Sequence, residues 1–355
     1  MFDDPNLKFL YRIVRANFKT PFFPPKVGFI TTYRCNLKCQ MCKIWEKQPG
    51  NELSCDEIEN FFSISNKFSW VGVTGGEPFL RKDLAQISEI ILHNCKDLCV
   101  IQFATNGTLT ETILETTERI IASKNSKVKV LFSISIDGVR EAHDKIRGVP
   151  GSWDRTVQTY LRLKSFPGVE PRINITLTND NADTFEDIFL SIKDKFPPLK
   201  IDDIGINIFQ KSPFYYANQK LPDLEESLII KTIDKILQFR GSHFSYNNFI
   251  RRAYLKSYKY FIHNKRPSFN CQALSFNCLI DPAGDIYPCN VINKKISNIR
   301  DFNYDLSDFW RRPIVNELRI KCFQNDCPSC WSPCEAYSAI ICGLLKNIPQ
   351  AIRLL

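Results

Sequence analysis

The sequence predicts an α/β fold in which six βα units curl into an incomplete barrel, followed by a small cysteine-rich extension with a β-hairpin. Between residues 26 and 210, short runs of β-branched residues alternate with amphipathic segments of helical period, which is typical of a parallel sheet with crossover helices. The cysteines form two groups, three within eight residues near the N-terminus and eight between Cys271 and Cys342. Because the loops that follow parallel strands meet on one face, we expect a ligand site there.

The predicted elements follow one another in a regular order. The six strands, rich in β-branched residues, span residues 27–32, 70–74, 100–105, 128–136, 172–177 and 204–208. The helices between them are expected to begin near Ser54, Leu84, Thr110, Ser152 and Thr184, with Ser54 and Glu57 spaced as a capping box. Two further helices, over 224–239 and 249–262, lead to the extension. We therefore divide the chain into an N-terminal amphipathic helix (1–25), the barrel with its bridging helices (26–264) and the cysteine-rich extension (265–355).

Charge and hydropathy argue against several classes of protein. The chain has 355 residues and a formal net charge of +9, but its Lys and Arg residues are spread along it, so we expect no nucleic-acid partner. No segment approaches the roughly 20 apolar residues of a membrane-spanning helix, and the N-terminus lacks the apolar core of a signal peptide. We expect a cytoplasmic protein, in which fourteen cysteines are better explained by metal binding than by disulfides.

The first cysteine group lies in the loop that follows the first predicted strand. Cys35, Cys39 and Cys42 are separated by three and then two residues. A loop this short can wrap three thiolates around one iron–sulfur cluster, and because such clusters usually have four cysteine ligands, one iron would stay open to another ligand. A structural zinc site or unrelated thiols are the alternatives. Zinc would need a fourth ligand, and the nearest histidine, His93, is far along the chain.

This loop resembles that of the radical S-adenosylmethionine (SAM) superfamily, whose hallmark is the same three-cysteine spacing after the first strand of a partial (β/α)6 TIM-like barrel. The resemblance covers residues 26–210. It implies that the open iron binds the amino and carboxylate groups of SAM, and that reductive cleavage of SAM yields a 5′-deoxyadenosyl radical. Met41 stands where many members have an aromatic residue that contacts adenine.

The ends of the next strands carry further candidate residues. Gly75, Gly76 and Glu77 follow the second strand and match the family motif for the SAM amino group; glycines allow close backbone approach and a carboxylate accepts from an ammonium group. Thr105 and Asn106 close the third strand. Ordinary turn chemistry is the alternative for each of these motifs.

The resemblance extends to the fourth strand and the segment after it. It implies that Ser135 and Asp137 lie near the ribose and the reactive carbon of SAM. It also implies that Arg147 binds the SAM carboxylate, which suits the bidentate geometry of a guanidinium group.

The second cysteine group begins with Cys271 and Cys278, which precede a predicted hairpin over 281–289. The rest of the group follows as Cys289, Cys322, Cys327, Cys330, Cys334 and Cys342. Eight cysteines are the number that two four-iron clusters require, and a zinc ribbon is the alternative.

This region resembles the SPASM extension of radical SAM enzymes, in which a Gly and a Cys are spaced as Gly284 and Cys289 are here. The resemblance implies three four-iron clusters in all, or two if there is a single auxiliary cluster. One auxiliary ligand set would be Cys271, Cys278, Cys289 and Cys334, and the other Cys322, Cys327, Cys330 and Cys342. Full coordination by four thiolates favours electron relay. Asn290 replaces the Asp base of sulfatase-maturing enzymes, which argues against that reaction.

We therefore expect an oxidoreductase or transferase that abstracts hydrogen from a peptide, a small metabolite or a lipid-linked substrate, with flavodoxin or ferredoxin as the reductant. The alternative is a non-catalytic iron–sulfur or zinc scaffold. Some 25 residues precede the first strand, too few for a separate leader-binding domain, so a peptide substrate would need a stand-alone partner or no leader. The apolar and basic segments 7–19 and 340–355 suggest peripheral membrane contact, or helices that cover the open edge of the barrel.

Overall fold

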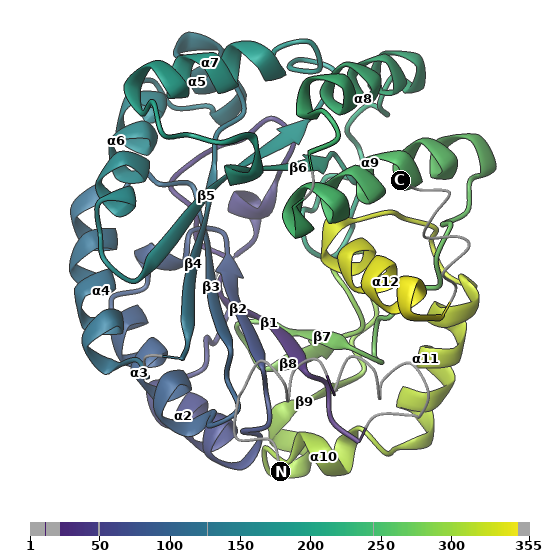
Figure 1. The fold of residues 1–355 in the computed structure, drawn as a ribbon. Coiled ribbons are helices and arrows are strands. Elements are labelled where there is room, and N and C mark those ends of the chain that lie inside the picture. Colours follow the sequence, from purple (N-terminus) through teal and green to yellow (C-terminus); the bar gives the residue numbers. More distant parts are fainter. Residues whose placement is uncertain (1–10, 12–21, 49, 126, 244, 347–355) are drawn as a thin grey trace.

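The computed structural model describes residues 11, 22–48, 50–125, 127–243 and 245–346. Over these residues the strands form one nine-stranded sheet in the order β6-β5-β4-β3-β2-β1-β7-β8-β9. The sheet curls into a partial barrel that does not close (Figure 1). The predicted fold class is confirmed.

The six predicted strands are present and all pair in parallel, as the alternation of sequence pattern indicated. They are β1 (Lys26–Thr32), β2 (Trp70–Gly75), β3 (Val100–Thr105), β4 (Lys129–Ser135), β5 (Val169–Leu177) and β6 (Ile204–Ile208). Only β5 differs clearly, beginning at Val169 rather than at residue 172. The two residues before Arg172 are Glu170 and Pro171, which are poor strand formers, so the sequence pattern understated this strand.

Helices cover the outer face of the sheet. They are α2 (Cys55–Ile64), α3 (Leu84–Asn94), α4 (Thr110–Ser123), α5 (Glu141–Arg147), α6 (Ser152–Lys164) and α7 (Phe185–Lys195). The capping box of α2 is confirmed: the Ser54 hydroxyl accepts from the Glu57 N–H, and the Glu57 carboxylate accepts from the Ser54 N–H. The seven-residue helix α5 was not predicted, because two turns are too short to display a helical period.

The remaining side of the barrel is crossed by α8 (Glu226–Arg240) and α9 (Tyr246–Asn264), with α9 packed against α8 and α12 (Figure 1). The free edge of β6 is capped by two buried guanidinium groups, since Arg240 and Arg251 both donate to the carbonyl of Ile204. Covering an edge strand in this way removes a surface on which another chain could add a strand.

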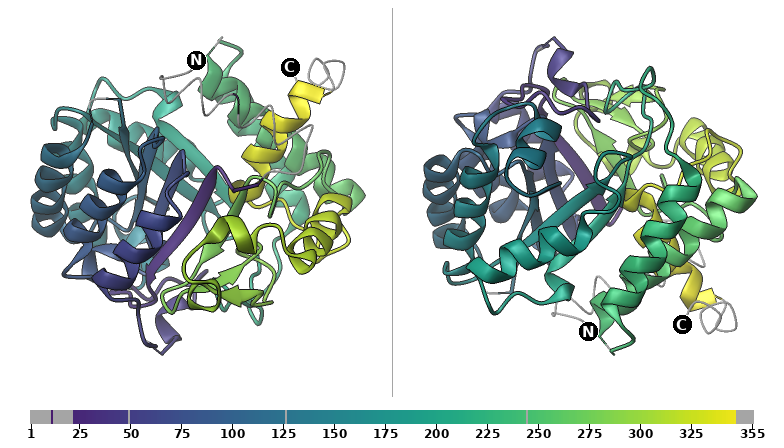
Figure 2. Two further views of the ribbon diagram at one scale, coloured as in Figure 1. Left: turned by 90° about the horizontal axis from the view of Figure 1, so that it is seen from below. Right: turned by 90° about the horizontal axis from the view of Figure 1, so that it is seen from above.

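The extension continues the barrel sheet. Its elements are β7 (Asn277–Ile280), β8 (Asp285–Tyr287), β9 (Ser297–Asn298), α10 (Leu306–Phe309), α11 (Pro313–Gln324) and α12 (Pro333–Lys346). The predicted hairpin is present as β7 and β8, with Gly284 in the turn at a φ of 85°. Its first strand lies before the predicted range 281–289 and contains Cys278. β7 also pairs in parallel with β1, with Cys278 opposite Val27. Figure 2 shows the outer helices on one side of β1 and the extension on the other.

One apolar core runs through both parts. It joins barrel residues such as Phe29 and Phe103 to extension residues such as Ile286 and Trp310. The predicted N-terminal helix over 7–19 and the tail beyond residue 346 lie outside the described residues, apart from Tyr11. In the described part of the chain, no helix has both the length and the apolar character needed to cross a membrane.

Candidate active site

A cavity of about 230 Å³ opens at the carboxyl ends of the barrel strands. It is lined by side chains or backbone from four of the predicted motifs, together with the loop after β6 and the start of α12. The predicted residues that line it are Cys35, Cys39, Met41, Cys42, Gly75, Gly76, Thr105, Asn106, Ser135 and Arg147. Two predicted cofactor contacts, Glu77 and Asp137, do not line the cavity but lie buried behind it.

The cluster loop, residues 33–43, is held from outside by the C-terminal end of α5. The N–H of Lys38 donates to the Arg147 carbonyl at 3.1 Å, and the N–H of Gln40 donates to the Ile146 carbonyl at 2.9 Å. The last carbonyls of a helix have no partner within the helix, so they are free to fix a neighbouring loop. Gly148 ends α5 in the left-handed region, and a Cβ there would lie 2.5 Å from the Lys38 carbonyl. Only glycine permits this close approach.

The three thiols of this loop face one cavity. Burial raises the pKa of Cys35 to about 11 and that of Cys42 to about 12, so neither forms a thiolate at neutral pH without a cation beside it. Bound iron would supply that charge, because metal binding deprotonates coordinating thiols. Three soft ligands on one loop fit a four-iron cluster with one iron open. Among the described residues, no three His, Cys, Asp or Glu side chains converge on a point where a single ion would bind.

Glu77 ties the ends of β2 and β3 together. Its carboxylate accepts from the Asn106 N–H at 2.7 Å, from the Thr105 hydroxyl at 2.9 Å and from the Phe79 N–H at 3.3 Å. Complete burial raises its pKa to about 7, against the opposing effect of these hydrogen bonds. The carboxylate therefore acts within the protein, and the part of this motif that reaches the cavity is the backbone of Gly75 and Gly76.

Arg147 lies between the thiols and a buried carboxylate. Its Nη2 is 2.5 Å from Asp137 Oδ2, and its Nη1 donates to Cys39 Sγ at 3.7 Å. Its Nε is buried and finds no hydrogen-bond partner among the residues that the structure describes. Burial lowers the pKa of this guanidinium, but the charges of Asp137 and Cys39 outweigh that effect and raise it overall. A charged guanidinium group whose Nε is unpartnered in the described structure fits an anionic ligand at this wall of the cavity.

The loop after β6, residues 209–218, closes the cavity and was not identified from the sequence. The Tyr215 hydroxyl bonds Thr74 Oγ1 at 2.8 Å and donates to the Gly75 carbonyl at 3.0 Å. Asn218 Nδ2 donates to the Met41 carbonyl at 2.9 Å. The loop thus joins the cluster loop to the glycine motif. The sequence signal that could have identified this loop is its position after the sixth strand together with its aromatic and amide residues, such as Tyr215, Tyr216 and Asn218.

The extension cysteines are spread over four places. Cys334 lines the cavity beside Ser332 and Pro333, and Cys278 lies in the main core on β7. Cys342 packs against Phe276. The others lie together: Cys271, Cys289, Cys322 and Cys330 share a small apolar cluster, and Cys327 is hydrogen-bonded to Cys322. This cluster therefore contains cysteines from both expected ligand sets. Each set also has at least one member elsewhere: Cys278 and Cys334 from the first set, and Cys342 from the second.

Two polar side chains of the extension, Glu335 and Asn290, are buried and hydrogen-bonded. Glu335, which the sequence analysis missed, accepts from Asn277 Nδ2 at 2.8 Å, and complete burial raises its pKa to about 7. A single acidic residue after a cysteine gives no sequence signal of burial. Asn290, which the sequence analysis singled out, donates to Ser332 Oγ at 3.1 Å and is not part of the cavity wall.

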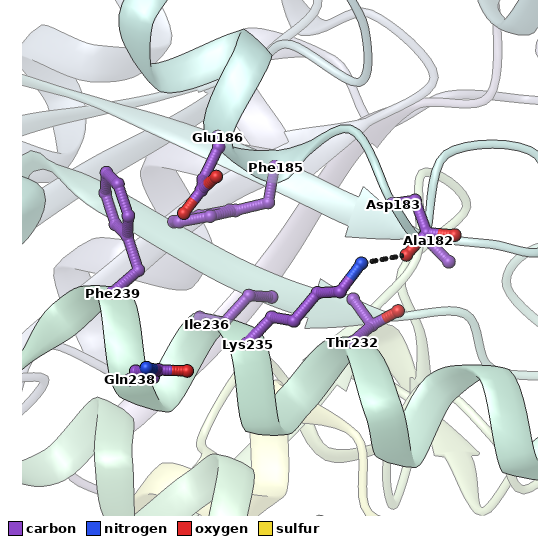
Figure 3. A pocket seen from close by; sticks show the side chains of 9 residues that line it. All are labelled: Ala182, Asp183, Phe185, Glu186, Thr232, Lys235, Ile236, Gln238 and Phe239. Carbon is purple, nitrogen blue, oxygen red and sulfur yellow. Dashed lines mark hydrogen bonds and ion pairs between the residues drawn. The ribbon is translucent and has the colours of Figure 1, made fainter.

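A second cavity of about 370 Å³ lies between α7 and α8 on the outer surface (Figure 3). Lys235 Nζ and Asp183 Oδ1 form an ion pair of 2.9 Å across it, and Phe185 and Phe239 contribute aromatic walls. None of the predicted site residues lines this cavity.

Comparisons with known proteins found a matching family and several similar proteins. Residues 29–192 match the radical SAM superfamily. The chain is 26% identical over 327 residues to the antilisterial bacteriocin subtilosin biosynthesis protein AlbA of Bacillus subtilis, covering 86% of this chain and 65% of AlbA. It is 27% identical over 344 residues to the AdoMet-dependent heme synthase of Nitratidesulfovibrio vulgaris, covering 89% of this chain and 86% of that protein.

The fold is also similar to that of solved structures. SuiB of Streptococcus suis, solved with S-adenosylmethionine, superposes with a TM-score of 0.59 at 18% identity, covering 88% of this chain and 71% of SuiB. SuiB has also been solved with its precursor peptide SuiA. Residues 29–192 thus form a domain of the radical SAM superfamily, and the cysteine-rich region after it is consistent with the SPASM type.

Proposed function

We propose that this protein is a radical SAM enzyme that cleaves SAM reductively and uses the 5′-deoxyadenosyl radical to abstract hydrogen from a peptide, leading to oxidation or bond formation. The observation that carries the proposal is the convergence of Cys35, Cys39, Cys42 and Arg147 on one cavity at the ends of the barrel strands. The carboxyl ends of barrel strands are where enzymes of this architecture bind their ligands.

Different residues of the cavity would bind different parts of the cofactor. Cys35, Cys39 and Cys42 would bind a four-iron cluster, which supplies the electron that breaks a carbon–sulfur bond of SAM. Arg147 Nε is the unused donor for the SAM carboxylate, and the backbone of Gly75 and Gly76 is open to the amino group. The remaining contacts would come from Met41 to the adenine and Ser135 to the ribose. Asp137 would act through Arg147, since its carboxylate lies behind the cavity.

We further propose that the extension holds at least one auxiliary four-iron cluster. The gathering of Cys271, Cys289, Cys322, Cys327 and Cys330 supports one such cluster. A second would require Cys278, Cys334 and Cys342 to find a fourth partner. Iron determination after anaerobic reconstitution separates these cases, because one auxiliary cluster predicts about 8 iron atoms per chain and two predict about 12.

The lining of the cavity favours a peptide. Apart from Arg147, the described residues that line it are uncharged, and several are aromatic or amide side chains such as Trp45, Tyr216 and Gln210. An amino-acid side chain would fit such a wall without additional cations. AlbA, which is similar to this chain in sequence, is named for bacteriocin biosynthesis. SuiB, which is similar in fold, has been solved with a precursor peptide.

A tetrapyrrole is the second candidate, because this chain covers 86% of an AdoMet-dependent heme synthase. The carboxylates of such a substrate would need several cations, and Arg147 already pairs with Asp137. Incubation with a peptide encoded beside the gene and with an iron coproporphyrin, followed by mass spectrometry, decides between the two.

Turnover of SAM itself is the first test. After anaerobic reconstitution, dithionite and SAM should yield 5′-deoxyadenosine, and we propose that flavodoxin or ferredoxin replaces dithionite in the cytoplasm. The triple variant Cys35→Ala, Cys39→Ala, Cys42→Ala should lose about 4 iron atoms and all cleavage. Absence of 5′-deoxyadenosine from the reconstituted wild-type protein would favour a non-catalytic metal-binding scaffold.

A further inference from the structure

Arg147 contacts the cluster loop through its backbone and its side chain. Its carbonyl accepts from the Lys38 N–H at 3.1 Å, and its Nη1 donates to Cys39 Sγ at 3.7 Å. The side chain is buried, with Arg147 8% exposed and Asp137 fully buried. A hydrogen bond from a charged donor in such a place is stronger than one in water.

The guanidinium group is held in place from behind by Asp137. One carboxylate oxygen pairs with Arg147 Nη2, and the other accepts from the Thr176 N–H at 2.7 Å. The backbone around Asp137 is also fixed, since its N–H donates to His143 Nδ1 at 3.1 Å and its carbonyl accepts from Asn181 Nδ2 at 2.9 Å. The two strand ends β4 and β5 therefore set the direction of the Arg147 side chain toward Cys39.

We propose that Arg147 is a positioning residue that sets the reduction potential of the cluster on Cys35, Cys39 and Cys42 by donating an N–H···S hydrogen bond to Cys39, whether or not SAM is bound. The inference rests on the proposed function, which places a cluster on these cysteines. Adding an electron increases the negative charge on the cysteine sulfurs, so a charged donor at one of them stabilises the reduced cluster. The Nη1 and Nε atoms of one guanidinium would then serve different ligands, Nη1 the cysteine and Nε the cofactor carboxylate.

The test is the midpoint potential of this cluster without SAM, measured by redox titration followed by EPR in the holoprotein. Arg147→Gln removes both the charge and the paired N–H donors of the guanidinium group. Arg147→Lys keeps the charge but loses the paired donors. We expect both variants to shift the reduction equilibrium tenfold or more toward the oxidised cluster, which is about 59 mV for one electron. Arg162→Gln removes a charge from the surface of α6 and should leave the potential unchanged.

A spectroscopic measurement on the unmodified protein does not depend on how the variants fold. In protein labelled with 15N-arginine, pulsed EPR of the reduced cluster without SAM should detect a weak coupling to a guanidinium nitrogen. Loss of that coupling in labelled Arg147→Lys would assign it to Arg147. A wild-type protein without the coupling would overturn the inference.

The variants contradict the inference in two ways. If Arg147→Gln weakens SAM binding but leaves the potential of the SAM-free cluster unchanged, Arg147 acts only on the cofactor. If Arg147→Lys keeps the wild-type potential while Arg147→Gln does not, net charge rather than the hydrogen bond sets the potential. Failure of the wild-type triad to bind iron is a separate result, because it removes the proposed function as well.

Discussion

At the scale of single residues, the shape of the cavity depends on buried polar side chains behind the cysteines. Glu77 joins two strand ends, and Asp137 aims Arg147 toward the cluster loop. His143 is a third buried polar side chain behind the cysteines. It is fully buried, and its Nδ1 accepts from the Asp137 N–H. Such groups are costly to bury, and each makes at least one hydrogen bond. Each also makes stability sensitive to protonation.

His143 should make the protein less stable in acid. Burial and then the charge of Arg147 lower its pKa from 6.5 to about 3. A histidine with a depressed folded-state pKa contributes stability above its unfolded pKa and loses it as pH falls, here from about 6.5 toward 3. The free energy of unfolding should fall by up to about 1.4 kcal/mol per pH unit through this group.

Urea unfolding between pH 4 and pH 8 measures this dependence. The His143→Gln variant should show a flatter decline over the acidic part of that range, because glutamine does not titrate. The matched control is His93→Gln, which changes an exposed histidine at the end of α3 and should follow the wild type. Equal slopes in His143→Gln and wild type would show that another group causes the acid sensitivity.

At the scale of elements, the segments that hold the cluster loop include α5 and the loop after β6. Helix α5 supports it through the carbonyls of Ile146 and Arg147. The loop 209–218 holds it from the other side through Asn218 and the backbone of Tyr216, whose carbonyl accepts from the Lys43 N–H at 2.8 Å. A loop of eleven residues would otherwise pay a large conformational entropy on binding a cluster.

Gly148→Ala should damage the cluster loop more than its neighbour Gly151→Ala. Both glycines have positive φ values, 73° and 71°, so each substitution costs about 1 kcal/mol in backbone strain. Only at Gly148 would the new Cβ also collide with the Lys38 carbonyl, whereas at Gly151 the nearest atom is 3.9 Å away. Gly148→Ala should therefore bind less iron at the triad.

Iron content and melting temperature after reconstitution test this pair. The expected pattern is a similar small loss of thermal stability in Gly151→Ala with full iron, and a larger loss with reduced iron in Gly148→Ala. Equal iron contents in the two variants would show that the α5 contact does not support the loop.

Tyr215→Phe should weaken SAM binding while preserving the packing of the ring. The substitution leaves Thr74 Oγ1 and the Gly75 carbonyl, both partly buried, without this partner, which costs about 1 kcal/mol. The KM for SAM in 5′-deoxyadenosine formation should rise several-fold. Tyr260→Phe, at an exposed position on α9, is the control, and an unchanged KM in Tyr215→Phe would remove the loop from cofactor binding.

At the scale of the whole molecule, the barrel and the extension share one sheet and one core. Strand β7 pairs with β1, and Trp310 and Ile286 lie in the same apolar cluster as Phe29. The boundary proposed near residue 265 lies just after α9 ends at Asn264. Because the two parts share a sheet and a core, we propose that they fold as one unit.

Removal of residues 265–355 should abolish cooperative folding of the barrel. The truncated chain would expose the edge of β1 and the apolar side chains that pack against the extension, which is a large hydrophobic loss. Circular dichroism during urea unfolding should show one transition for the full chain and a shallow, non-cooperative change for the fragment. A fragment with a sharp transition at the same midpoint would show that the two parts fold separately.

The sequence by itself determined the strands, the position of the cysteine loop and the hairpin of the extension. These features depend on neighbours within a few residues, such as the β-branched run of β1 or the spacing of Cys35, Cys39 and Cys42. Glu335 gave no local signal and the loop 209–218 only a weak one, because their roles come from distant partners.

Only the tertiary structure decided which cysteines meet, how α5 supports the cluster loop and where Arg147 points. The contact of Arg147 with Cys39 joins residues 108 positions apart, and the pairing of β7 with β1 places Cys278 opposite Val27. Contacts of this kind depend on how the sheet curls and which faces pack together. Local sequence period carries no information about either, because it reports which face of an element is apolar and not what covers that face.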